Sequence, residues 1–218
     1  VALVLAFLAQ PAAAAGVPHY QRLVLVVLEN TAADAAAAQP FLQQLATEGA
    51  SLSAHLAITH PSQPNYVALV AGDLLGVTDN DRYVIDATHL GDLVEAKGLD
   101  WHVYAKGFPG DCSQMATRGD YARRHVPFLS FKNVVDVPQR CAKITDAVGF
   151  SADASSGLLP AFTLYVPDNG SNGHDTGVEA ASRWLEQTFG PLLASPTFRQ
   201  GTLFIVTFDE GTAADNRV

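Results

Sequence analysis

Short apolar runs separated by segments of helical character make up most of the chain between residues 23 and 208. The apolar runs are Leu23–Leu28, Ala54–Thr59, Trp101–Ala105, Phe162–Val166 and Leu203–Phe208. Uninterrupted apolar runs of this length are typical of strands buried on both faces, as in a parallel sheet. Helices are predicted between them at Pro40–Glu48, Asn65–Val70, His89–Lys97 and Val178–Phe189. This alternation predicts an α/β fold, a three-layer sandwich with a mostly parallel central sheet.

Polar clusters directly follow four of the five predicted strands. They are Glu29-Asn30, His60-Pro61-Ser62, the segment Asp168–Asp175, and Asp209-Glu210. In open α/β sheets, ligands bind at the carboxyl ends of the strands. The sequence therefore predicts that these clusters meet in one site.

Length and charge restrict the classes of function. A chain of 218 residues fits one large domain, and its net charge is −9. An acidic surface disfavours non-specific binding to nucleic acid or to anionic membranes. A small phosphorylated substrate remains compatible, because a metal ion in a cleft reverses the local field.

The N-terminal segment has the character of a secretory signal peptide. Residues 1–9 are apolar and uncharged, and small residues at 12–15 provide an A-x-A cleavage site. We therefore expect a partial signal peptide over residues 1–15, one domain over 16–218, and a secreted or periplasmic location. The run is too short to span a bilayer, so no stable membrane insertion is expected. The alternative is a buried N-terminal helix or strand.

The chain contains two cysteines, Cys112 and Cys141. In an exported protein, a pair of cysteines suggests a disulfide. The alternative is two buried free thiols.

The acidic pairs predict a metal site. Glu29, Asp209 and Glu210 would repel one another if they met in a buried site without a cation. With Asn30 they offer carboxylate and amide oxygens, which suit Mg²⁺, Ca²⁺, Mn²⁺ or Zn²⁺. Taken singly, each residue could instead be a solvated loop carboxylate or a helix cap.

Ser62 is the candidate nucleophile. It stands between a predicted strand and a predicted helix, and a helix N-terminus favours a bound phosphate. Asn65 lies in the first helical turn and is expected to face the same anion. Ser62 could also be a simple helix cap, which does not exclude the catalytic role.

Two further segments carry histidines. His174 lies in a glycine-rich loop with Asp168 and Asp175, and it could protonate a leaving oxygen. His125 lies in the locally basic segment Tyr121–Phe128, where it could reach a phosphate. A plain Asn-Gly turn and an exposed basic turn are the respective alternatives.

Five motifs together resemble a known family. The strings LVVLEN, HPSQPNY, YARRHVPF, GHD and IVTFDEG, in this order, are similar to the bacterial phosphoesterase family of acid phosphatases, phosphatidylinositol-phosphate phosphatases and phospholipases C, within the alkaline phosphatase superfamily. The resemblance implies an alkaline phosphatase-like fold. It implies Ser62 as nucleophile, Asn65 as phosphate contact, and His125 and His174 near the phosphate. It also implies metal binding by the two pairs Glu29-Asn30 and Asp209-Glu210.

The expected activity is therefore metal-dependent hydrolysis of phosphomonoesters through a phosphoserine intermediate. His60, Asp168 and Asp175 are candidate substrate-binding residues. The alternatives are a phospholipase C-type phosphodiesterase and a non-catalytic exported binding protein. One position departs from the family, because Lys106 stands where relatives usually carry an acidic residue.

The end of the sequence carries a separate expectation. The apolar run Leu203–Phe208 predicts a central strand buried on both faces. The chain ends soon after it, whereas relatives continue, so we expect a C-terminally truncated domain with an apolar edge or face exposed beside this strand.

Overall fold

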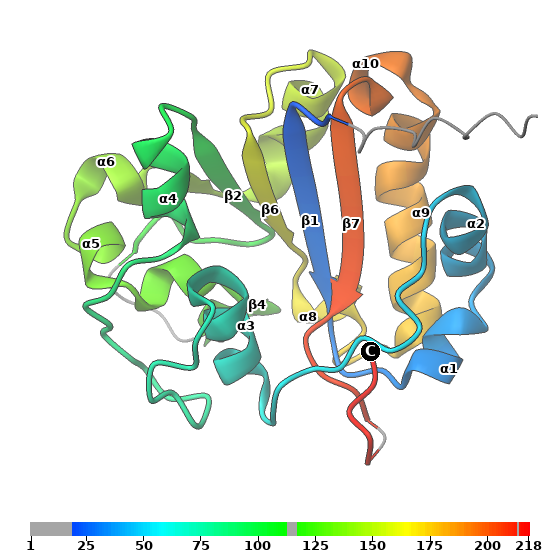
Figure 1. The fold of residues 1–218 in the computed structure, drawn as a ribbon, viewed down its shortest axis with the longest axis horizontal. Helices are drawn as coiled ribbons and strands as arrows, with labels where there is room; N and C mark the ends of the chain where they lie inside the picture. Colours follow the sequence, from blue (N-terminus) through cyan, green and yellow to red (C-terminus); the bar gives the residue numbers. More distant parts are fainter. Residues whose placement is uncertain (1–18, 113–116, 213) are drawn as a thin grey trace, which may run out of the picture.

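The computed structural model describes residues 19–112, 117–212 and 214–218 (Figure 1). A five-stranded sheet forms its centre, with strand order β5-β2-β6-β1-β7 and every pairing parallel. The strands are β1 (Arg22–Leu28), β2 (Trp101–Ala105), β5 (Ile144–Thr145), β6 (Phe162–Val166) and β7 (Thr202–Phe208). A separate two-stranded ribbon consists of β3 (Thr117–Arg118) and β4 (Tyr121–Ala122).

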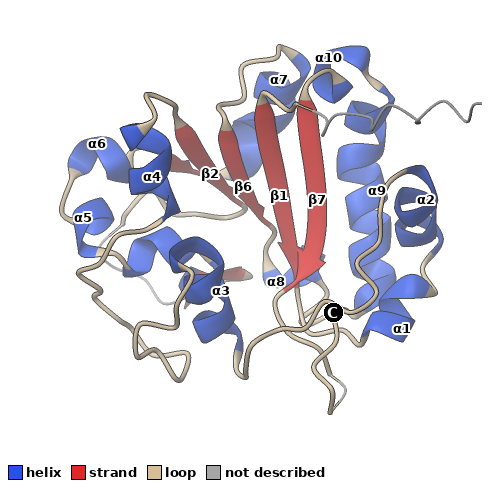
Figure 2. Ribbon diagram, in the orientation of Figure 1, coloured by secondary structure: helices blue, strands red, loops and turns tan. Residues whose placement is uncertain are grey.

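Helices cover both faces of the sheet, which gives the predicted three-layer α/β sandwich (Figure 2). Side chains alternate along each strand. Leu25 and Val27 of β1 therefore enter one apolar core, whereas Val24 and Val26 enter the other. Because both faces are covered, the strands can carry apolar side chains on both sides, and this explains their largely apolar sequences.

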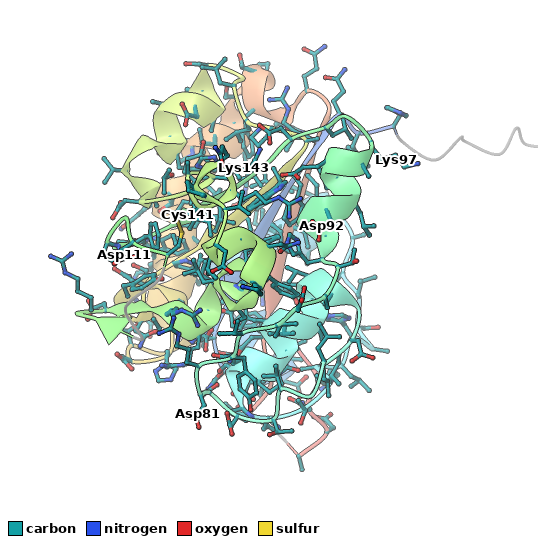
Figure 3. All side chains as sticks on the ribbon, turned by 90° about the vertical axis from the view of Figure 1, so that its left-hand side faces the viewer. Asp81, Asp92, Lys97, Asp111, Cys141 and Lys143 are labelled. Carbon is teal, nitrogen blue, oxygen red and sulfur yellow. A yellow bond between two sulfur atoms is a disulfide. The ribbon has the colours of Figure 1, made fainter. Side chains whose placement is uncertain are left out.

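The first layer contains α3 (Ser62–Ala71), α4 (Leu90–Ala96), α5 (Lys132–Val135), α6 (Pro138–Cys141) and the 3-10 turns η1 (Arg123–His125) and η2 (Pro127–Ser130). Figure 3 views the molecule from this side and labels Asp92 of α4. Arg140 of α6 forms ion pairs with Asp92 and Glu95, which hold α4 against α6.

The second layer contains α1 (Ala33–Ala37), α2 (Pro40–Glu48), α7 (Phe150–Ser155), α9 (Val178–Ala194) and α10 (Pro196–Arg199), with the 3-10 turn η3 (Ala147–Gly149) before α7. The long helix α9 buries Ala181, Leu185, Phe189 and Leu192, which recur every three or four residues and so form one face. A short helix, α8 (Asn169–Asn172), follows β6 at the carboxyl edge of the sheet.

Most of the predicted elements are present, and α9 is longer than expected. The sequence predicted that this helix ends at Phe189, before Gly190-Pro191, yet it continues to Ala194 with Pro191 inside. Leu192 is buried beyond the proline, and this packing favours continuation of the helix despite the missing backbone donor.

The predicted strand Ala54–Thr59 is wrong. The segment forms only an isolated bridge between Leu56 and Arg217, and its side chains Leu56 and Ile58 are exposed. The backbone N–H groups of Ile58 and Thr59 donate to the Asn65 side chain instead of to a neighbouring strand. Its composition is similar to that of a strand, but among the described residues the segment pairs with no strand of the sheet.

The last strand does not have the predicted central position among the described residues, but the expected open edge beside it is present. In the part of the molecule that the structure describes, β7 pairs with β1 alone and lies at the edge of the sheet. Its residues from Thr202 to Thr207 are only half-buried, as expected for a strand with one open edge.

The predicted disulfide is confirmed. Cys112 and Cys141 are bonded, with a sequence separation of 29 residues (Cys141 is labelled in Figure 3). The bond ties the segment after β2 to the end of α6.

We expect the Cys112→Ser/Cys141→Ser double variant to lose about 3–4 kcal/mol of unfolding free energy, because an open loop of this length gains entropy in the unfolded chain. Urea unfolding of the oxidised protein and of the double variant, both in non-reducing buffer, measures this difference. Equal midpoints and slopes for the two proteins would contradict the stabilising role.

No helix among the described residues is long and apolar enough to cross a membrane. The predicted signal peptide over residues 1–15 lies outside the described residues.

Candidate active site

The candidate site lies at the carboxyl edge of the sheet, where β1 and β7 end beside the N-terminus of α3 (Figure 1). Pairing of β1 with β7 places Leu28 opposite Phe208, so the acidic pairs that follow these strands emerge side by side. Asp209 continues the ladder by donating its backbone N–H to Leu28 O at 3.0 Å. The parallel register therefore brings together two pairs that are 180 positions apart.

Ser62 lies within this group of acids. It is the first residue of α3, and its side chain is buried. Its Oγ lies 3.3 Å from Glu29 Oε2 and 3.2 Å from Glu210 Oε1. The N-terminus of a ten-residue helix thus carries a hydroxyl directly beside two carboxylates.

Glu29, Asp209 and Glu210 are all buried, and the described residues place no lysine or arginine in an ion pair with them. Burial raises the pKa of Glu29 well above its usual value, and the neighbouring Asp209 raises it further. Burial also raises the pKa of Asp209 to about 6, with a contribution from Glu210. Asp209 Oδ2 is buried without a hydrogen-bond partner in the protein. The site therefore gathers three buried acids, and the nearby Arg124 lowers the pKa of Glu29 by its charge.

Asn30 completes the group. Its backbone has a φ of 28°, a left-handed conformation that Asn tolerates better than most residues. Its side-chain amide lies 3.2 Å from both Asp209 Oδ1 and Glu210 Oε1. An amide nitrogen facing these carboxylates would donate to both, whereas an amide oxygen in that place would need a shared cation.

The donor set fits a divalent metal ion. Three carboxylates and one amide offer the hard oxygen ligands that such ions prefer. The orphaned oxygen of Asp209 and the raised pKa of both buried acids show that a positive charge would relieve this cluster. Across the described residues, no three His, Cys, Asp or Glu side chains have the spacing of a preformed metal centre, so binding would require the side chains to adjust.

His60 approaches the same group from outside. Its Nδ1 lies 2.5 Å from Glu210 Oε2, and 57% of its side chain is exposed. The sequence assigned His60 to substrate binding. The structure shows a residue that both contacts an acid of the site and faces solvent.

Asn65 has a different set of partners from the expected phosphate. Its Oδ1 accepts from the backbone of Ile58 and Thr59, and its Nδ2 donates to Thr59 O at 2.8 Å and Pro61 O at 3.2 Å. The side chain therefore holds the loop that leads into Ser62. The phosphate contact stays a prediction.

Tyr66 is a site residue that the sequence reasoning missed. Its hydroxyl donates to Glu29 Oε1 at 2.5 Å in a fully buried contact. Burial and the negative charge of Glu29 raise the pKa of Tyr66 well above its usual value, so the phenol remains a donor. Its position four residues after Ser62, on the same helical face, was the available signal.

The two predicted histidines lie next to each other. His125 is buried, its ring stacks on Tyr66 with centroids 5.2 Å apart, and its Nε2 lies 3.3 Å from Glu29 Oε1. Burial lowers the pKa of His125 well below its usual value, which favours the neutral ring. The His174 ring lies 6.3 Å from the His125 ring and is oriented by Asp175, 2.6 Å away.

The Asp168 side chain contacts Lys106 rather than the groups around Ser62. It pairs with Lys106 Nζ at 3.1 Å, and Lys106 also donates to Ser171 Oγ at 2.6 Å. The lysine that departs from the family pattern therefore neutralises one of the candidate substrate-binding carboxylates.

An apolar pocket adjoins the site on the β7 side. Asn65, Tyr66 and Asp209 form the wall nearest the acids. The remaining lining residues are Val27, His55, Leu56, Ala57, Ile58, Ala68, Leu69, Thr207 and Phe208.

Comparison with known proteins finds phosphatases among the relatives of this chain. The chain is 35% identical over 201 residues to "Probable acid phosphatase" of Kluyveromyces lactis, which covers 88% of this chain and 48% of the relative. It is 33% identical over 199 residues to the phosphate-repressible acid phosphatase of Penicillium chrysogenum, with the same two coverages. It is 32% identical over 206 residues to the phosphatidylinositol-3-phosphatase of Mycobacterium tuberculosis, covering 91% of this chain and 66% of that protein.

The chain thus spans about half the length of the fungal relatives. The model of the phosphoesterase family matches residues 20–215, which include every residue of the site described above. This chain belongs to the phosphoesterase family.

Proposed function

We propose that this site hydrolyses phosphomonoesters with the help of a divalent metal ion, and that Ser62 is transiently phosphorylated. The observation that carries the proposal is the buried Ser62 hydroxyl at the N-terminus of α3, within 3.3 Å of Glu29 and Glu210. A helix N-terminus favours a phosphoryl group, and a hydroxyl in this position can attack it. The acid phosphatase relatives support this reaction class.

Glu29, Asn30, Asp209 and Glu210 would hold the metal ion, and the positive charge would lower the pKa of the serine hydroxyl and offset charge on the phosphoryl oxygens. The protein itself contributes the orientation of the Ser62 hydroxyl. The hydrogen bonds of Asn65 fix the loop before α3, so that Ser62 has a defined position. In-line attack by Ser62 Oγ forms the phosphoserine and releases the alcohol, and water then releases phosphate.

His174 is the better candidate to protonate the leaving alcohol. About a third of its side chain is exposed, and Asp175 orients its Nδ1. His125 is fully buried, and its lowered pKa favours the neutral ring, which lacks the proton that an acid must supply. A neutral His125 is better suited to pack beside Glu29 and Tyr66 than to transfer a proton.

A second candidate is hydrolysis of phosphoesters of apolar alcohols, including phospholipase C-type chemistry. The pocket beside Asp209 is lined by Leu56, Ile58 and Leu69, all partly or largely exposed. Such walls suit an apolar leaving group.

A secreted or periplasmic location forms part of the same proposal, and the disulfide supports an oxidising compartment.

Metal analysis combined with a chromogenic phosphomonoester tests the proposal. We expect the purified, undialysed protein to contain a divalent ion and to release 4-nitrophenol from its phosphate ester, and we expect chelation to stop turnover. Bound metal without turnover would instead support a non-catalytic binding protein. Full turnover without metal would overturn metal dependence.

A further inference from the structure

Tyr66 and Ser62 approach Glu29 from the same helix face but contact different oxygens. The Tyr66 hydroxyl donates to Oε1 at 2.5 Å, while Ser62 Oγ lies 3.3 Å from Oε2. The two side chains are one turn apart in α3, so a single rigid element contacts both oxygens of the carboxylate. We infer that Tyr66 is a positioning residue that holds Glu29 Oε1, so that Oε2 faces Ser62 and can serve the metal ion, an inference that rests on the proposed function.

Glu29 depends on this contact because the rest of its surroundings cannot replace it. The carboxylate is fully buried, so water does not reach Oε1. His125 Nε2 lies 3.3 Å from the same oxygen, but its alignment is too poor for a hydrogen bond. Without the phenol, Oε1 would be a buried acceptor with no donor, and the carboxylate could rotate to use both oxygens differently.

Packing holds the Tyr66 ring in one position. The Tyr66 ring is almost entirely buried in the core between α3 and the sheet. It also stacks on His125 with an interplanar angle of 21°. A donor on a ring that cannot move gives the carboxylate one orientation, as second-layer partners of metal ligands do.

Tyr66→Phe isolates the hydroxyl, because phenylalanine keeps the ring and its stacking. The matched control is Tyr104→Phe. Tyr104 is also buried, and its hydroxyl donates to Asp153 Oδ2 at 2.6 Å, but it lies in the core on the opposite face of the sheet. Both variants therefore lose one phenol–carboxylate hydrogen bond, and only one of them touches the site.

The measurement is calorimetric titration of metal-stripped protein with Mn²⁺, Zn²⁺, Mg²⁺ and Ca²⁺. For the ion that binds the wild type most tightly, we expect the dissociation constant of Tyr66→Phe to rise roughly 10–100-fold. We expect Tyr104→Phe to match the wild type. The metal-free melting temperatures of both variants should fall, and Tyr66→Phe should lose more, since its hydrogen bond is fully buried whereas that of Tyr104 is partly buried.

A second variant provides an independent readout. Glu29→Asp shortens the side chain by one methylene and withdraws its carboxylate from the Tyr66 hydroxyl. In this background, Tyr66→Phe should add less than about threefold to the dissociation constant, because coupled residues are not additive.

The possible outcomes distinguish a failure of the positioning role from a failure of the proposed metal site. A wild-type dissociation constant retained in Tyr66→Phe overturns the positioning role and leaves the metal site standing. An equal loss of metal affinity in Tyr66→Phe and Tyr104→Phe also overturns it, because the effect would then be a general loss of packing. Full additivity of Tyr66→Phe with Glu29→Asp overturns it as well, because the two side chains would then act independently. A wild type that binds none of the four ions overturns the proposed metal site and this inference with it.

Discussion

Ser62→Ala is expected to lower kcat/KM for a phosphomonoester by roughly 10⁴-fold or more, because it removes the attacking oxygen itself. The surrounding acids remain, and alanine is compatible with the start of a helix, so the fold should persist. The Ser62 hydroxyl contacts Glu29 and Glu210 from the N-terminus of α3, and the described residues offer no second serine in contact with both acids.

Ser182→Ala provides the matched control. Ser182 is also a buried helical serine, but it lies on α9 in the opposite layer of the sandwich. Steady-state kinetics, with circular dichroism to check folding, should show near wild-type rates for this variant. Acid quenching of the wild type during turnover should also trap a phosphoryl group on the peptide containing Ser62. Activity of Ser62→Ala within tenfold of the wild type would exclude the covalent mechanism.

Asp209→Asn is expected to have two opposite effects. It should abolish tight metal binding, because it removes a charged ligand from the group of four. It should also stabilise the metal-free protein at pH 7.5. The pKa of Asp209 is raised to about 6 from a usual value of 3.8, so its ionised form disfavours the folded state by about 3 kcal/mol. A neutral amide of the same shape avoids this cost.

The sign of the pH dependence follows from the same values. Because the folded pKa of Asp209 lies above the unfolded one, its stabilising contribution is fully present below about pH 3.8 and is lost as the pH rises through about 6. Metal-free Asp209→Asn should therefore lack this component of the pH profile.

Urea unfolding of metal-stripped proteins at several pH values, beside metal titration, measures both effects. Asp153→Asn is the control, since this acid pairs with Tyr104 away from the site. A metal-free Asp209→Asn protein that is less stable than the metal-free wild type would show that Asp209 is a structural residue.

The strands buried on both faces were the most predictable part of the fold. Trp101–Ala105 and Phe162–Val166 lie inside the sheet, and burial on both faces is what their largely apolar sequences indicate. The segment Ala54–Thr59 has a similar composition but a different environment. Its backbone is held by Asn65 and Asn216 side chains rather than by a strand, and such tertiary contacts leave no local periodicity in the sequence.

The acids of the site were predictable for a related reason. Glu29 and Asp209 follow apolar strands, and parallel strands end at a common edge, so their proximity follows from the topology. The spacing of Tyr66 from Ser62 indicated a shared helical face, but not that its hydroxyl reaches Glu29. The pairing of Lys106 with Asp168 had no such signal. Both contacts depend on how one helix or loop is rotated against the sheet.

The pairing of β1 with β7 has a consequence for the synthesis of the protein on the ribosome. Arg22 is paired with Thr202, so about 180 further residues are synthesised before the β7 partner of β1 exists. At a typical elongation rate of about 5–20 residues per second, this delay is roughly 10–40 s. During that time the edge of β1 that later accepts β7 is open to other strands, which makes the nascent chain a candidate client for chaperones. Slow synonymous codons upstream of residue 202 would lengthen this exposure without changing a single amino acid.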